Sequence, residues 1–282
     1  MNSIELPIIG SGSQPKEADG LELDFLHLPG AMHTYSMPEL SPSLSQSAIQ
    51  AKALLQLILD ALNTLDPAEN YTFETFGLTL KDLAFLNETL GEGEVSIIHQ
   101  GEASQTRIQE SVLAGVWRVQ SFNLAGEIQA DVIEVGAIPQ IVKDYTFNNA
   151  QRQLDINQHT LPAGLMNALP LVGELNAQIQ TFNPETYAHV INLSLLPLTE
   201  QDLAFLHNLL GTGKVSILSR GYGTNRITST ATSKVWWVQY FNSDDKLILN
   251  TLEIDQVPKV ACAAREDLAD SASRLQEILD CC

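Results

Sequence analysis

The sequence predicts an α+β protein made of two tandem pseudo-symmetric repeats. Each repeat is expected to have helices packed on a small antiparallel sheet, and an extended N-terminal arm precedes the first repeat. Three observations predict this fold: part of the sequence is duplicated, each copy passes from helical to strand patterns, and the first segment is rich in Pro, Gly and Ser. A chain of 282 residues is long enough to bury two cores.

The duplication is the strongest signal in the chain. Residues 78–101 and 198–221 are identical at 14 of 24 positions, with a shift of 120. After a one-residue deletion, residues 107–141 and 226–260 are identical at 10 of 35 positions. Agreement over this length indicates a duplication rather than chance. It predicts two units, over 46–143 and 166–262, joined by a linker over 144–165.

Each unit begins with a helical pattern. Apolar spacing predicts a helix over 48–62 in the first copy and over 165–182 in the second, each followed by a short strand. A second helix then starts at Thr79, because Thr is a favoured N-cap and Asp82 stands three residues later, as in a capping box. Gly91 is predicted to end this helix. The second copy repeats the signature with Thr199, Asp202 and Gly211.

The remainder of each unit has strand patterns. Alternating, β-branched and aromatic residues predict strands over 95–97, 116–122 and 128–135 in the first copy, joined as an antiparallel meander. The corresponding strands of the second copy are predicted over 215–217, 235–241 and 247–254.

The two ends of the chain differ from the units. Residues 1–45 carry turn-forming runs such as 10–15 (GSGSQP), which predict an extended arm without a core of its own. Residues 263–282 are predicted to form a C-terminal helix and tail. Apolar residues at helical spacing, Leu268, Ala272, Leu275 and Leu279, indicate that this helix docks on the rest of the protein.

Composition excludes several classes of function. The 15 Lys and Arg residues against 34 Asp and Glu residues give a formal net charge of −19, which disfavours nucleic acid as a partner. No apolar run is long enough to cross a membrane, so no membrane insertion is predicted. The first residues lack the pattern of a signal peptide, and the three cysteines are not spaced as a disulfide framework. We therefore expect a cytoplasmic protein.

No motif predicts catalysis. The run 211–214 (GTGK) lacks the spacing of a phosphate-binding loop, the histidines lack metal-ligand spacing, and no nucleophile turn is present. We therefore predict no enzyme, no catalytic residue, no metal ligand and no cofactor. One alternative stays open, in which Cys262, Cys281 and Cys282 form a metal or redox site.

Two residue types recur in both copies and allow two interpretations. Arg107 returns as Arg226, and Trp117 returns as Trp236. In the first interpretation each arginine pairs with a repeated acid such as Glu134 or Glu253, and each tryptophan packs under the sheet. In the second they form a pair of partner-binding patches, because Arg and aromatic residues anchor interfaces.

The chain resembles the HupH/HyaF family of hydrogenase expression and maturation proteins. The residues that carry the resemblance are 10–15, 28–32, Thr34, Tyr35 and Pro38 in the arm, with 91–95 and 115–119 in the first unit. The second copy departs from this pattern at Lys214, Lys234 and Trp237.

The resemblance implies an accessory protein or chaperone in the biogenesis of a membrane-bound uptake [NiFe] hydrogenase. Its implied partners are a hydrogenase subunit precursor, with the iron–sulfur small subunit favoured, and other hydrogenase accessory proteins. The alternative is a cysteine-based metal or redox protein that acts in hydrogenase assembly. The candidate partner-binding residues are Pro29, Met32, Tyr35, Arg107, Trp117, Arg226 and Trp236.

Overall fold

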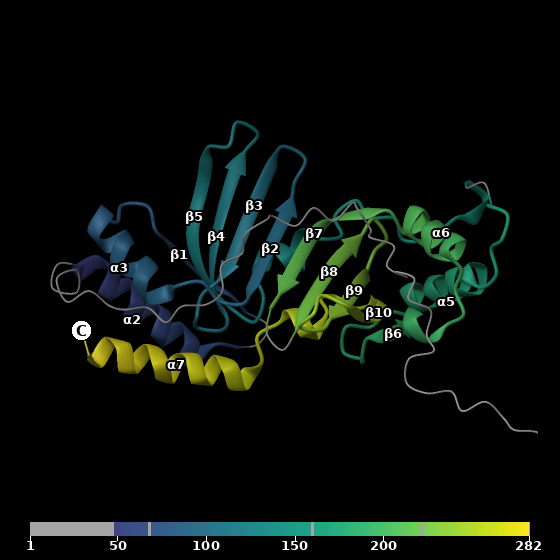
Figure 1. Cartoon of the computed structure of the whole chain (residues 1–282). Coiled ribbons are helices and arrows are strands. Elements are labelled where there is room, and N and C mark those ends of the chain that lie inside the picture. The colour runs from purple at the N-terminus through teal and green to yellow at the C-terminus, as the bar shows by residue number, and fades with distance from the viewer. Residues whose placement is uncertain (1–47, 67–68, 159–160, 221–222, 282) are drawn as a thin grey trace, which may run out of the picture. The chain divides into compact units, whose positions relative to one another are not determined.

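The computed structural model of the chain describes residues 48–66, 69–158, 161–220 and 223–281. The predicted arm, with Pro29, Met32 and Tyr35, lies outside the described residues, as does Cys282. Within them, the same succession of a helix, a strand, a helix and four strands occurs twice (Figure 1). No described helix is long and apolar enough to cross a membrane.

The elements follow the predicted order. The first unit comprises α2 (Ile49–Thr64), β1 (Tyr71–Glu74), α3 (Leu80–Leu90), β2 (Val95–Gln100), β3 (Ser104–Glu110), β4 (Val116–Asn123), β5 (Ile128–Val135) and α4 (Gln140–Tyr145). After a short 3-10 turn, η1 (Ile156–Gln158), the second unit comprises α5 (Ala168–Gln180), β6 (His189–Asn192), η2 (Leu193–Leu195), α6 (Glu200–Leu210), β7 (Thr212–Ser219), β8 (Thr224–Thr230), β9 (Val235–Phe241), β10 (Leu247–Ile254) and η3 (Lys259–Ala261). The chain ends in α7 (Arg265–Asp280). Strands β3 and β8 were not among the predicted elements.

The strands of both units form one sheet. Its order is β1-β5-β4-β3-β2-β7-β8-β9-β10-β6, and β2 pairs with β7 in antiparallel register from Val95↔Ser219 to His99↔Val215. The prediction of a separate small sheet for each unit was therefore wrong. The physical reason is that β2 and β7 would each be an unpaired edge, with exposed N–H and C=O groups that a neighbouring strand satisfies.

Helices cover the two ends of one face of this sheet. In the first unit α2 and α3 pack on β4 and β5 through residues such as Leu55, Phe85 and Val116. In the second unit α5 and α6 pack on β9 and β10 through residues such as Leu175, Leu206 and Val235. Registers across the central strands place Val116 and Val235 on the same face, because residues directly opposite in a ladder share a face.

The opposite face carries a core that both units share. Trp117 and Trp236 are both fully buried in it, together with apolar residues of β2, β3, β7 and β8. Each indole N–H donates to a backbone carbonyl, Trp117 to Gly136 at 2.8 Å and Trp236 to Gln256 at 3.3 Å. The two tryptophans thus occupy matching environments, and a buried indole N–H finds its partner.

Two segments outside the repeats are also packed. Helix α7 lies along α2, and its Leu268 and Leu275 enter the core of the first unit (Figure 1). The predicted linker 144–165 packs against the second unit, because Leu154 is 3% exposed within the core there. Each unit is therefore completed by a segment that follows the last strand of the other unit.

A single aspartate joins two helix starts in each unit. Asp82 forms the predicted capping box with Thr79 at the start of α3. Its other oxygen accepts from the N–H groups of Gln50 and Ala51, each at 3.1 Å, at the start of α2. Asp202 does the same for α6 and α5, where the N–H groups of 166–168 donate to it. The Thr79 hydroxyl bond, with the backbone donors, lowers the pKa of Asp82 against the opposing effect of burial.

We predict that Asp82→Ala lowers the free energy of unfolding by about 2–4 kcal/mol, because it leaves the starts of two helices without their acceptor. The pKa of Asp82 is lower in the folded than in the unfolded chain, so its contribution is present above the unfolded pKa and is lost as pH falls through the folded pKa. Urea denaturation at pH 7 and at acid pH measures both effects. Asp60→Ala, on the exposed side of α2, is the control. Equal losses in the two variants would contradict the prediction.

Candidate partner-binding face

The middle of the sheet has a face that no described helix packs against. The strands β3, β2, β7 and β8 contribute no residue to either helix-packed core on that side. Pairing registers and the alternation of side chains define this surface, which we call the central face. It consists of Ser96, Ile98, Arg107, Gln109, Ser216, Leu218, Arg226 and Thr228. Arg107 is exposed, Leu218 is buried and the other six are half-buried.

Each unit contributes one arginine stacked on a phenylalanine to the central face. The Arg107 guanidinium carbon lies 5.0 Å from the Phe122 ring centroid, and that of Arg226 lies 4.6 Å from the centroid of Phe241. Arg107 is exposed, and its Nε–H donates to Gln105 Oε1 at 2.9 Å. The Nε of Arg226 is buried without a hydrogen-bond partner among the described residues. The rings hold both guanidinium groups in place, and the Nη groups of both arginines make no hydrogen bond to a described residue.

The expected pairing of these arginines with repeated acids is not what the structure shows. Arg107 is opposite Gln120 in the β3–β4 ladder, whereas Glu134 is opposite Trp117 and so lies on the other face. Glu134 accepts instead from the N–H of Gln140 at 2.6 Å and from the amide of Asn70 at 2.5 Å. The same alternation separates Arg226 from Glu253. The recurrence of an arginine and an acid in both copies therefore does not predict that their side chains are in contact across the sheet.

Trp117 and Trp236, which were also proposed to bind a partner, are both 0% exposed. Their rings lie inside the shared core and cannot reach a partner's surface in this fold. The alternative interpretation, that each tryptophan packs under the sheet, agrees with the structure. Of the four candidate residues that the structure describes, Arg107 and Arg226 are therefore the two that lie on the central face.

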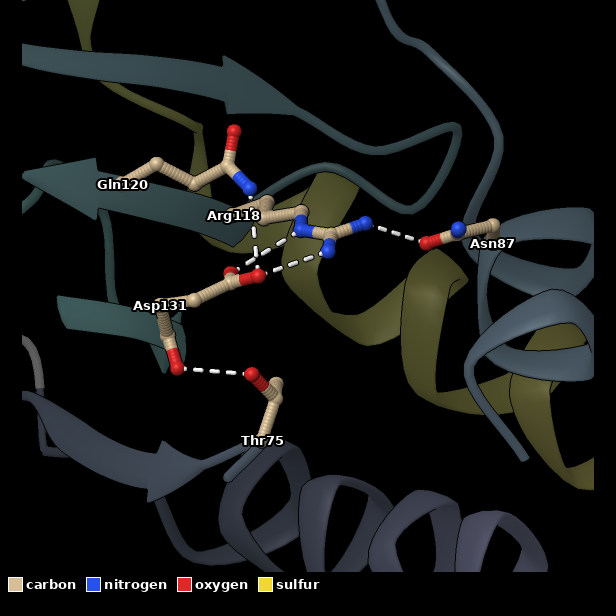
Figure 2. A network of polar contacts seen from close by, with 5 residues as sticks. All are labelled: Thr75, Asn87, Arg118, Gln120 and Asp131. Carbon is tan, nitrogen blue, oxygen red and sulfur yellow. Dashed lines mark hydrogen bonds and ion pairs between the residues drawn. The ribbon is translucent and has the colours of Figure 1, made fainter. Parts of the chain in front are cut away.

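A polar cluster flanks the central face in the first unit (Figure 2). Arg118 on β4 donates from Nε and Nη2 to the two carboxylate oxygens of Asp131 on β5, at 3.0 and 2.8 Å. Its Nη1 donates to the side-chain carbonyl of Asn87 on α3, and Gln120 donates to Asp131 at 3.1 Å. The Thr75 hydroxyl donates to the backbone carbonyl of Asp131 at 2.7 Å. The cluster thus ties α3 and the end of β1 to the sheet.

The second unit replaces this ionic cluster with aromatic residues. By the duplication, Arg118, Asp131 and Asn87 correspond to Trp237, Asn250 and His207. The Trp237 indole N–H donates to Asn250 Oδ1 at 2.6 Å, and the His207 ring lies 5.9 Å from the Trp237 ring. Burial lowers the pKa of His207, which favours its neutral form. The two ends of the sheet therefore have the same backbone but different chemistry.

The cysteines do not form a metal site among the described residues, where no group of three or more His, Cys, Asp and Glu side chains has suitable geometry. Cys262 is half-buried, and burial raises the pKa of its thiol to about 11. Cys281 is exposed and caps the C-terminus of α7. Cys282 lies outside the described residues.

Sequence reasoning missed Phe122 and Phe241 as parts of the site. A signal was present, because the pair Phe122-Asn123 returns as Phe241-Asn242. However, the phenylalanines come from β4 and β9 and the arginines from β3 and β8, so the contact depends on strand register, which periodicity alone does not determine.

Comparison with known proteins gives consistent results. The family model of the HupH hydrogenase expression protein, C-terminal conserved region, matches the chain twice, over residues 48–155 and 165–282. The chain is 44% identical to the hydrogenase expression/formation protein HoxQ of Cupriavidus necator, over 99% of this chain and 98% of that protein. It is 40% identical to the hydrogenase expression/formation protein HupH of Rhodobacter capsulatus, over 99% and 98% of the two chains. A solved structure, the hydrogenase expression protein HupH from Thiobacillus denitrificans, is 31% identical with a TM-score of 0.39, over 41% of this chain and 97% of that chain.

We predict that Arg118→Trp lowers the free energy of unfolding by about 1–3 kcal/mol, because it leaves the largely buried carboxylate of Asp131 without its ion partner. Adding Asp131→Asn, which builds the Trp–Asn pair of the second unit, should restore part of the loss. Urea denaturation of the wild type, both single variants and the double variant gives the coupling energy. Additive losses in this cycle would show that the two side chains do not act as a pair.

Proposed function

Because the chain belongs to the HupH hydrogenase expression protein family, we propose that it is an accessory protein in the biogenesis of a membrane-bound uptake [NiFe] hydrogenase. The observation that carries this proposal is its 40–44% identity, over nearly the whole of both chains, to proteins named for hydrogenase expression and formation. We propose further that it acts as a chaperone, with the precursor of the iron–sulfur small subunit as its partner and with other hydrogenase accessory proteins as further contacts.

The central face supports a binding role. It combines a row of small polar and apolar side chains with two arginines that are held on aromatic rings, and Arg and aromatic residues are the types that anchor protein interfaces. Arg107 and Arg226 come from equivalent strands on either side of the β2–β7 pairing. A partner that accepts hydrogen bonds from both would lie across the four central strands.

The acidity of the chain supports the same role. A net charge of −19 attracts basic segments of a precursor at long range, whereas the two arginines can donate hydrogen bonds to carboxylates or carbonyls at short range. The cysteine-based alternative receives less support, because a Cys262 thiol with a raised pKa stays protonated at neutral pH and the thiolate is the form that binds metals and reacts.

We predict that Arg107→Ala combined with Arg226→Ala weakens binding of the hydrogenase small-subunit precursor at least tenfold, because both anchors of the central face are lost. Co-purification and titration with that precursor measure the loss. Arg265→Ala, which removes an exposed positive charge at the start of α7, is the control and should bind as the wild type does. Thermal melting should be similar for all variants. Unchanged binding by the double variant would place the interface elsewhere.

We also predict that deletion of residues 1–40 leaves thermal melting of the two units unchanged while hydrogenase maturation fails. This segment carries apolar residues, among them Leu28, Met32 and Tyr35. Burial of their side chains on a partner can offset the entropy that is lost when the segment becomes ordered. Melting by circular dichroism and hydrogenase activity of a complemented deletion strain are the two measurements. Full maturation by the truncated protein would make the segment a tether only. Loss of folding would make it part of the core.

A further inference from the structure

The second unit binds an extended stretch of its own chain in a defined way. The N–H of Gln151 donates to Ala231 O at 2.9 Å, and the N–H of Ser233 donates to Gln151 O at 2.8 Å, so that Gln151 forms a parallel bridge beside the β8–β9 turn. The Gln151 side chain donates to Leu209 O at 3.0 Å and to the Thr232 hydroxyl at 2.8 Å. The end of α6 and the β8–β9 turn therefore form a receptor for an extended segment.

The first unit has the same receptor without that occupant. By the duplication, Val112 and Ala114 correspond to Ala231 and Ser233, and Thr89 corresponds to Leu209. Among the described residues, nothing pairs with the carbonyl of Val112 or the N–H of Ala114. Both residues, with Thr89, line a cavity of about 1080 Å³. Helix α7 forms the far wall, and apolar side chains such as Val260 and Ile278 also line it.

Glu110 makes this cavity chemically different from the Gln151 site of the second unit. Its side chain is 7% exposed and accepts one hydrogen bond, from the Gly115 N–H at 3.0 Å. The corresponding residue in the second unit is Ser229. Its hydroxyl accepts a hydrogen bond from the Val215 N–H at 2.9 Å and donates one to the Val215 carbonyl at 3.2 Å. The fold therefore builds this turn without a carboxylate, and a buried carboxylate with one donor is costly unless something else pairs with it.

The charges around Glu110 indicate what would pair with it. The other charged residues that line the cavity are Glu94 before β2 and, on α7, Asp267, Arg274 and Glu277. Four carboxylates thus face one guanidinium among the described lining residues. Burial, opposed by the Gly115 hydrogen bond and aided by the charges of Glu94 and Asp267, raises the pKa of Glu110 to about 7. A cation in the cavity would relieve both the desolvation and the repulsion.

We infer that the cavity between the β3–β4 turn and α7 binds an extended segment of a partner polypeptide that carries a Lys or Arg side chain between apolar residues. The backbone of the segment pairs with Val112 and Ala114, as Gln151 does in the second unit, and its cation reaches Glu110. The chain's own residues 1–47 fit this chemistry poorly, because they contain one Lys or Arg, Lys16, against six Asp and Glu residues. The site is separate from the central face and does not depend on the partner proposed for that face.

The test uses the full chain and a labelled octapeptide in which lysine alternates with leucine, with a glutamate–leucine octapeptide as the matched probe. We expect fluorescence anisotropy to show binding of the lysine peptide only. Glu110→Ser, which installs the residue of the second unit, should weaken binding at least tenfold, because a charge-assisted contact is lost. Glu127→Ser removes an equal charge from the exposed β4–β5 turn and should change the affinity less than twofold. Equal losses of affinity in the two variants would show that the peptide responds to the overall negative charge of the protein rather than to Glu110, and would overturn the inference.

Two further readouts separate this site from a loss of folding. The lysine peptide should bind more tightly at pH 8 than at pH 6 in the wild type, because Glu110 ionises between these values, and this pH difference should shrink in Glu110→Ser. Hydrogen exchange at the amide of Ala114 should slow on peptide addition, while that of Ser233, already bonded, should not change. Protection of Ala114 in the free full chain would mean that its own residues occupy the cavity, and this too would overturn the inference.

Discussion

The antiparallel pairing of β2 with β7 is the interaction on which the rest of this structure depends. Without it each unit would present an unpaired inner edge, and the core that contains Trp117 and Trp236 would be divided into two halves. The pairing makes one ten-stranded sheet with both helix pairs on the same face. It also creates the central face, because the described helices of this side pack on the outer strands and none of them packs on the four strands around the junction.

Segments beyond the repeats complete the two units differently. The stretch around Gln151 and Leu154 packs in extended form on the second unit, where it fills the space beside the β8–β9 turn. Helix α7 packs on the first unit and lines one side of a cavity at the corresponding place. A helix satisfies its own backbone, so it leaves the groups of Val112 and Ala114 available, whereas an extended segment bonds with their counterparts. One duplicated backbone thus has two different surfaces.

The two copies differ at several positions that are equivalent in the fold. Arg118 corresponds to Trp237 and Glu110 to Ser229, and Gly115 corresponds to Lys234. The last pair shares a left-handed backbone, with φ of 78° and 66°, which glycine adopts without strain. Lys234 lies there with its ammonium 5.8 and 5.4 Å from the rings of Phe147 and Phe182, contacts that offset the strain. The first unit thus has charged side chains, Arg118 and Glu110, where the second has Trp237 and Ser229.

The sequence by itself determined the duplication, the capping boxes of Thr79 and Thr199, the strands around both tryptophans and the docking of a C-terminal helix, because these are local patterns of spacing and residue type. It also identified Arg107 and Arg226 as candidates. Only the tertiary structure decided that the strands of both units form one sheet and that the tryptophans are buried. It also decided that the arginines lie on a different face from Glu134 and Glu253, and that Glu110 lines a cavity. Those features depend on which edges pair and in which register, and on which distant segment covers each core. Such contacts join residues far apart in the chain, and no local periodicity encodes them.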